Sequence, residues 1–208
     1  MPGNNEGYVV FDEFADTVAS LELIAAAIPQ AETQPRIWKW VLLAAHSALQ
    51  GACVAILTRT DGSGALDRKS QCELRNYYEN GAAWEIETQE RGQNQKDIVP
   101  YPEQRLAALP VLVERLPDGL GCQNGKRLAR KGKFKDSDFR KLHAFRNNFA
   151  HFAPASWAIE RSGLPRITLR AIDLSEQIIL SNSYFRYNRF IETDALALIE
   201  KIRGIMPK

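Results

Sequence analysis

Cysteine is scarce in this chain, and its spacing is irregular. The three cysteines are Cys53, Cys72 and Cys122. An odd number at such distances gives neither a disulfide framework nor the paired spacing of a zinc site. No HExxH sequence is present, and His143 and His151, eight residues apart, would lie ~12 Å apart along a helix, too far to bind one ion together. We therefore expect reduced cysteines, no metal and no cofactor.

Long apolar runs and an N-terminal leader are also missing. The first residues, MPGNNEGY, place no positive segment before an apolar one, and no run approaches the roughly 20 apolar residues that span a bilayer. These absences predict a soluble, cytoplasmic protein with no membrane contact. With 45% hydrophobic residues, the chain is expected to form a single helical domain over 1–208, with an inserted region around 60–121. That region could be a lid, a dimer contact or a docking surface.

Apolar residues recur at helical spacing along most of the chain, and no βαβ alternation is seen. The pattern predicts an all-α bundle of five to seven helices. The segment 157–169 alternates as a short extended hairpin would, or it is a loop that leads into a helix. The predicted helices are Tyr8–Ile28, closed by Pro29; Gln34–Leu57, antiparallel to the first; Leu66–Gln89, interrupted at Asn80–Gly81; Glu103–Leu116; Asp136–Pro154; Ile167–Leu180; and Tyr187–Arg203.

The helix predicted between Asp136 and Pro154 carries most of the chemistry. Four apolar residues share the face expected in the core, namely Leu142, Phe145, Phe149 and Phe152. On the opposite side, polar residues that could form a site follow at steps of about one turn, namely His143, Arg146, Asn147 and His151.

The run RNNFAH, from Arg146 to His151, resembles the signature of the HEPN superfamily. HEPN domains are small and all-helical. Their RNA-cleaving members carry an arginine, four to six residues and then a histidine, commonly with a polar residue such as Asn147 directly after the arginine. The resemblance covers about this one helix, while the rest of the chain is similar in class only.

These residue types suit metal-free RNA cleavage. An imidazole such as His151 can accept or donate a proton near neutral pH, as attack by a 2′-hydroxyl on its own 3′ phosphate requires. The Arg146 guanidinium can bind two equatorial phosphate oxygens at once. Asn147 can orient the imidazole or hold the phosphate, and His143 and Asn148 are candidates for support. Arg146 and His151 lie ~140° apart around a helix, so two copies facing each other would enclose a substrate better than one.

The resemblance implies a homodimer in which two motif helices form a composite active site. It also implies 2′,3′-cyclic phosphate and 5′-hydroxyl products. Toxins held in check by an antitoxin or other inhibitor protein, and effectors of antiviral defence, are the settings it implies.

Positive charge is concentrated in the second half of the chain. Residues 1–100 hold 8 Lys and Arg against 14 Asp and Glu, a net charge of −6, whereas residues 101–208 hold 19 against 11, a net charge of +8. A run with no acid among its members is predicted to attract the RNA backbone, and it contains Lys126, Arg127, Arg130, Lys131, Lys133 and Lys135.

Two other interpretations belong to different functional classes. The same helix could belong to a non-catalytic HEPN-like module that binds RNA, a nucleotide or a protein partner, or to a helical scaffold without a ligand. In those cases His151 would be a cation near a helix C-terminus, and Arg146 would pair with a nearby acid. His46, within an alanine-rich helix, is expected to be a hydrogen-bonded core residue.

Overall fold

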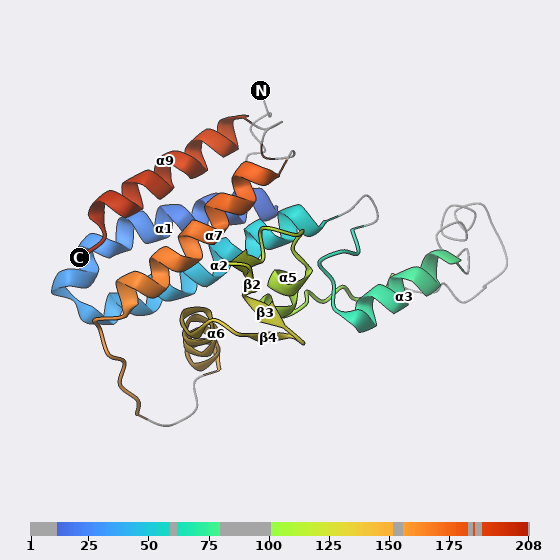
Figure 1. Ribbon diagram of the computed structural model, residues 1–208, viewed down its shortest axis with the longest axis horizontal. Helices are drawn as coiled ribbons and strands as arrows, with labels where there is room; N and C mark the ends of the chain where they lie inside the picture. The colour runs from blue at the N-terminus through green and yellow to red at the C-terminus, as the bar shows by residue number, and fades with distance from the viewer. Residues whose placement is uncertain are drawn as a thin grey trace, which may run out of the picture. The chain divides into compact units, whose positions relative to one another are not determined.

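The computed structural model describes residues 12–58, 62–79, 101–151, 156–182, 185 and 189–207. Over these residues the protein is all-α with two small hairpins, which confirms the predicted fold class (Figure 1). The chain divides into two compact units, the first formed by Met1–Ile56 with Leu109–Lys208 and the second by Leu57–Ala108. The helix α5 (Leu109–Arg115), which the prediction assigned to an inserted region, belongs to the first unit.

The first unit is a helical bundle in which α9 (Arg189–Ile205) packs along α1 (Glu13–Thr33). The helix α7 (Leu164–Ser181) contacts both α9 and α6 (Ser137–Ala150). In Figure 1, α1, α2, α7 and α9 run lengthwise beside one another, and α6 is seen end-on, across their direction. Its described helices are α1 (Glu13–Thr33), the 3-10 helix η1 (Pro35–Ile37), α2 (Trp38–Leu57), α5 (Leu109–Arg115), α6 (Ser137–Ala150), α7 (Leu164–Ser181) and α9 (Arg189–Ile205).

The helices α1 and α2 form the predicted antiparallel pair. Gly51, late in α2, lies so close to the start of α1 that a Cβ added there would be 2.5 Å from the buried Thr17 hydroxyl. Asp12 caps α1 by accepting a hydrogen bond from the Ala15 N–H. The prediction that Pro29 ends this helix is wrong, because α1 continues to Thr33. Ile28, directly before Pro29, and Ala31, two residues after it, are fully buried, and this burial offsets the hydrogen bond that proline cannot make.

Two hairpins lie between α5 and α6, in the basic run. Strands β1 (Cys122–Gln123) and β2 (Lys126–Arg127) pair antiparallel, as do β3 (Ala129–Arg130) and β4 (Lys133–Phe134). Each has a two-residue turn with positive φ at both positions, 50° and 71° in the first and 53° and 67° in the second, which favours Asn and Gly. The extended alternative at 157–169 is wrong, because α7 begins at Leu164 with Pro165 in its first turn.

The second unit contains α3 (Arg68–Glu79) and an extended stretch before α5. The prediction of a helix from Glu103 is wrong for its first half. Residues 105–107 instead pair with 65–67, through the Asp67 N–H to the Arg105 carbonyl (2.8 Å) and the Ala107 N–H to the Ala65 carbonyl (3.0 Å). The predicted interruption at Asn80–Gly81 and the helix beyond it lie outside the described residues.

One helical segment, Pro35–Leu57, is long and apolar enough to cross a membrane by length and composition alone. The prediction that no segment has these properties is therefore wrong. In the fold, however, 61% of its most apolar stretch is buried inside the protein. That burial is typical of the core helix of a soluble protein, in which the apolar surface is covered by neighbouring helices.

Candidate active site

The first turn of α6 is fixed by its cap and by two arginines of α7. Asp136 Oδ1 accepts hydrogen bonds from the backbone N–H groups of Asp138 (2.8 Å) and Phe139 (3.2 Å). Its other oxygen lies 3.2 Å from Arg170 Nη2, and the nearly buried Asp138 carboxylate accepts from Arg166 Nη2 at 2.9 Å. Carboxylates at a helix N-terminus also interact favourably with the helix dipole. These contacts hold the whole helix against α7.

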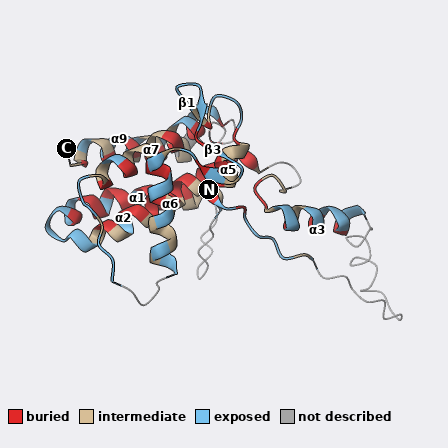
Figure 2. Cartoon of the chain, turned by 60° about the horizontal axis from the view of Figure 1, so that its bottom comes forward, coloured by how far each residue is buried: buried red, intermediate tan, exposed pale blue. Residues whose placement is uncertain are grey.

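The face of α6 that enters the core differs from the predicted one. Phe139 and Leu142 are buried, whereas Phe145 and Phe149 are only half-buried, and Phe152 lies outside the described residues. Figure 2 shows intermediate and exposed surface along much of α6. The apolar residues of this helix form two adjacent stripes along its surface, and only packing against the bundle decides which stripe is buried.

The buried side of α6 continues into a chain of polar contacts. Arg146 Nη1 donates to Asn147 Oδ1 at 3.1 Å, Asn147 Nδ2 lies 3.3 Å from His143 Nε2, and His143 Nδ1 lies 3.2 Å from His46 Nε2 on α2. Because a guanidinium only donates, Asn147 Oδ1 is the acceptor, and its amide nitrogen must donate to His143. His143 therefore carries its proton on Nδ1 and donates to His46. One arginine thus sets the orientation of the amide and the tautomers of both histidines.

His46 and His143, the two histidines of this hydrogen-bond network, are neutral near pH 7. Burial, followed by the charges of His143 and Arg146, lowers the pKa of His46 to about 3. Burial and then the Arg146 charge also lower the pKa of His143. The two rings stack with centroids 5.5 Å apart, and two positively charged imidazolium rings at this distance would repel each other. The expectation that His46 is a hydrogen-bonded core residue is confirmed, and His143 serves the network as a positioning group.

His151 stands outside this network. It is the C-cap of α6, where its backbone N–H donates to the Asn147 carbonyl at 2.9 Å, and it is exposed. Its imidazole makes no hydrogen bond to any residue that the structure describes. Asn148, predicted as support, is also exposed. The structure therefore places Arg146, Asn147 and His143 together and leaves His151 accessible at the end of the helix.

The predicted RNA-binding residues all lie exposed on the hairpins or in the segment joining β4 to α6, and they are Lys126, Arg127, Arg130, Lys131, Lys133 and Lys135. Arg127 is engaged with Asp118 (2.8 Å) and with the Glu114 carbonyl (3.0 Å). This run adjoins the N-terminal end of α6, whereas Arg146 lies ten residues further, ~15 Å along the helix axis. The basic hairpins thus lie at the opposite end of α6 from the motif.

Aromatic residues that the sequence did not single out surround the motif end of α6. The ring of Trp157 lies 4.9 Å from that of Phe149 and 6.4 Å from that of Phe145, measured between centroids. From α2, Lys39 Nζ lies 4.9 Å from the Trp40 ring and 5.8 Å from the Phe149 ring. In α2, the sequence feature that could have indicated this cluster is the run Trp38-Lys39-Trp40. Its first tryptophan is buried and its second is exposed.

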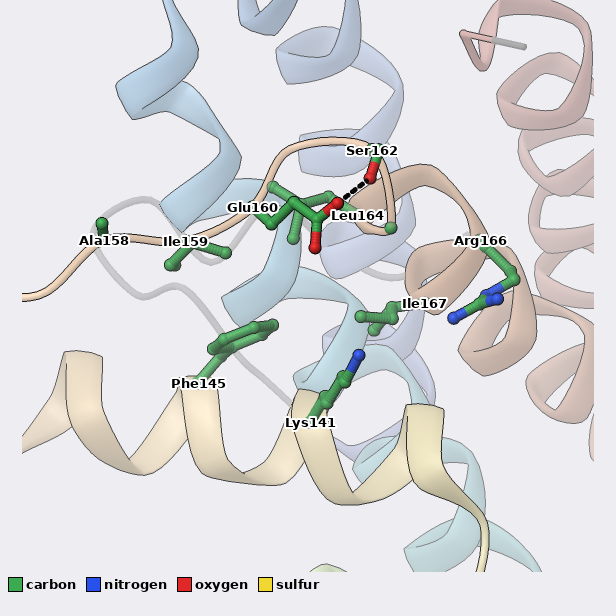
Figure 3. Close-up of a pocket in the computed structure, with 10 residues that line it drawn as sticks. Lys141, Phe145, Ala158, Ile159, Glu160, Ser162, Leu164, Arg166 and Ile167 are labelled. Atoms are coloured by element: carbon green, nitrogen blue, oxygen red, sulfur yellow. Dashed lines mark hydrogen bonds between the residues drawn. The ribbon is translucent and has the colours of Figure 1, made fainter.

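A cavity of about 540 Å³ opens between α6 and the start of α7. As Figure 3 shows, Lys141 and Phe145 point into it from α6, opposite Ile159 of the preceding loop and Ile167 of α7. Arg166 adds a second cation to its lining, and Glu160, which accepts a hydrogen bond from the Ser162 hydroxyl at 2.7 Å, adds an anion. The lining thus combines apolar side chains with a few charged ones, as small-molecule sites commonly do.

Among the described residues, no three His, Cys, Asp or Glu side chains lie close enough together to hold a metal ion. Cys53 is buried, and burial raises the pKa of its thiol well above the ordinary range. No protein-family model, no curated protein and no solved structure matches the chain. The site is therefore interpreted from its own residues.

Proposed function

We propose that this protein is a metal-independent endoribonuclease of the HEPN type, in which Arg146, Asn147 and His151 of α6 act on the scissile phosphate. The single observation that carries the proposal is the hydrogen-bond chain from Arg146 through Asn147 and His143 to His46, which holds the motif beside the exposed imidazole of His151. A network of this kind fixes an active-site guanidinium and amide before substrate binds.

In the proposed reaction, His151 removes the proton from a ribose 2′-hydroxyl, whose oxygen attacks the adjacent phosphorus. The bond from phosphorus to the 5′ oxygen breaks, and a second acid protonates that oxygen, giving a 2′,3′-cyclic phosphate and a 5′-hydroxyl. Arg146 Nη1 donates to Asn147, and a guanidinium has four further N–H groups with which it would bind the phosphate oxygens.

The count of histidines supports a homodimer. The chain has three, and two of them, His46 and His143, are neutral and bonded to each other. Each chain therefore offers one accessible imidazole, His151, while the reaction needs both a base and an acid. Two chains with their α6 helices facing would supply one imidazole for each role.

The proposed biological setting comes from the resemblance of the run Arg146 to His151 to the HEPN signature. A cytoplasmic toxin restrained by an antitoxin or other inhibitor protein, or an effector of antiviral defence, would use such a nuclease. The exposed lysines and arginines of the hairpins would hold the RNA backbone at a distance from the cut.

The test is cleavage of end-labelled transfer RNA and structured RNA in excess chelator. Wild type should leave 3′ ends that resist phosphatase until acid opens the cyclic phosphate. His151→Ala should slow cleavage by about 100- to 10,000-fold, the usual contribution of a general acid or base.

Substitutions at two arginines, one in the motif and one outside it as a control, complete the test. Arg146→Lys keeps a charge but loses the planar fork, so it should lose most of the activity, whereas Arg75→Ala, an exposed arginine of α3, should keep it. Full activity in both motif variants would reject the proposal. RNA binding without cleavage by wild type would instead indicate the non-catalytic module.

A further inference from the structure

An aromatic platform, defined as Trp40, Phe149, Trp157 and Lys39, lies at the motif end of α6. Trp40 is 50% exposed and Trp157 36%, whereas Trp38, two residues before Trp40 on the same helix, is 5% exposed. Trp157 contacts the Phe149 ring, and Trp40 is linked to that ring through Lys39. Large aromatic side chains normally bury most of their surface, so two exposed tryptophans connected in this way indicate a binding surface.

We propose that the aromatic platform stacks the unpaired bases of single-stranded RNA, so that the nuclease site receives flexible rather than double-helical RNA. This inference names the substrate class of the proposed nuclease and rests on that proposal. Every base has a π-face, which makes stacking on tryptophan independent of sequence. The Lys39 ammonium lies over both the Trp40 and Phe149 rings, where it can attract the phosphate that joins two stacked bases.

Position along α6 favours the platform over the basic hairpins as the holder of the cut site. Phe149 is three residues from Arg146 and two from His151, within ~5 Å along the helix axis. The hairpins adjoin the other end of the helix. Bases on either side of the scissile phosphate would therefore meet aromatic rings first.

The chemistry agrees with a single strand. The 2′-oxygen must move into line with the leaving 5′-oxygen, which a flexible nucleotide does readily and a nucleotide stacked in an A-form duplex does not. In a duplex the base faces are also covered by their neighbours, so the platform would find only sugar and phosphate edges.

The cavity between α6 and α7 extends the same surface. Phe145 stacks against Trp157, at 6.4 Å between centroids, and forms one wall of the cavity. Lys141 and Arg166 line the cavity, although Glu160 partly opposes their charge and Arg166 is paired with Asp138. Positive side chains thus also lie on the α7 side of the platform.

The experiment measures binding of the full-length protein to a labelled 2′-O-methyl oligonucleotide of about 12 residues, which lacks the attacking hydroxyl and cannot be cut. The same sequence as a duplex, and an abasic strand of equal length and charge, are the matched ligands. Fluorescence anisotropy gives the three dissociation constants. We expect the single strand to bind more tightly than either control ligand.

The variants are Trp40→Leu and Trp157→Leu, each of which removes an exposed ring. Each should weaken binding of the single strand by roughly 5- to 150-fold, the range for loss of one base stacked on an aromatic ring, with little effect on the abasic strand. Leu23→Ala, which shortens an apolar side chain of α1 that is 46% exposed, should bind as wild type does.

The inference is wrong if the duplex or the abasic strand binds as tightly as the single strand, or if both tryptophan variants bind normally. Cleavage of unmodified RNA, measured in parallel, separates this failure from that of the nuclease. Cleavage that depends on His151 but not on either tryptophan would reject the platform alone. Stacking that depends on the tryptophans, with no cleavage, would reject the nuclease alone.

Discussion

The pair of histidines between α2 and α6 should make the stability of the first unit fall as the solution becomes mildly acidic. In the unfolded chain both imidazoles take up protons as pH falls through about 6.5, the ordinary histidine pKa. In the folded protein they do not, because burial and the charges of His143 and Arg146 lower the pKa of His46 to about 3. The unfolded state therefore binds more protons between those pH values, and stability is lost as pH decreases.

The magnitude follows from the linkage relation. Between pH 8 and pH 5, His46 alone should lower the free energy of unfolding by about 2 kcal/mol, at 1.36 kcal/mol per pH unit below 6.5. His143, whose pKa is also lowered, changes stability in the same direction. The hydrogen bond from Arg203 lowers the pKa of Glu176, so protonation of this carboxylate destabilises the protein at lower pH. Measurements at or above pH 5 therefore separate the effect of the histidines from that of Glu176.

The assay is urea unfolding followed by far-UV circular dichroism at pH 8, 6.5 and 5, on wild type and His46→Gln. A glutamine places an amide near the position of the imidazole Nε2 and can accept from His143, but it does not titrate. The variant should lose about 2 kcal/mol less than wild type between pH 8 and 5. His151→Gln, which replaces an exposed imidazole outside the network, should retain the wild-type dependence. Equal losses in wild type and His46→Gln would refute the reasoning.

Two further perturbations test the packing and the basic surface. Gly51→Ala should destabilise the protein by about 1–2 kcal/mol, since overpacking against α1 exceeds the helix-propensity gain, whereas Gly204→Ala on α9, with nothing within 4 Å, should stabilise it by about 0.5–1 kcal/mol. Thermal unfolding measures both, and a stabilised Gly51 variant would contradict the contact. Neutralising Lys131, Lys133 and Lys135 together should reduce the slope of log K against log salt for single-stranded RNA by about 2. An unchanged slope would exclude the hairpins as a contact surface.

Local sequence determined where most helices lie and how several begin. Asp136 caps α6 because a carboxylate before the first turn can accept from free backbone N–H groups, and this needs no distant partner. The antiparallel pairing of α2 with α1 was also predicted from the sequence, and the close approach at Gly51 agrees with it. The dipeptide Asn124–Gly125 also favours a two-residue turn, although a hairpin was considered only at 157–169, as one of two alternatives there.

The tertiary structure decided which of these local features survive and which faces are covered. Pro29 remains inside α1 because burial on both sides of it outweighs the cost of a proline. Phe145 and Phe149 fit the core pattern as well as Phe139 does, but the bundle covers only the stripe that includes Phe139. A periodicity specifies a face and not its partner.

The candidate site shows the same division. Placing Arg146, Asn147 and His151 within six residues of one helix required only the sequence. The contact of His143 with His46, 97 residues away, and the position of Lys39 over the Phe149 ring required the folded chain. Helical spacing is a local property that repeats every 3.6 residues, whereas burial, tautomer and pKa depend on side chains that only packing of distant helices brings together.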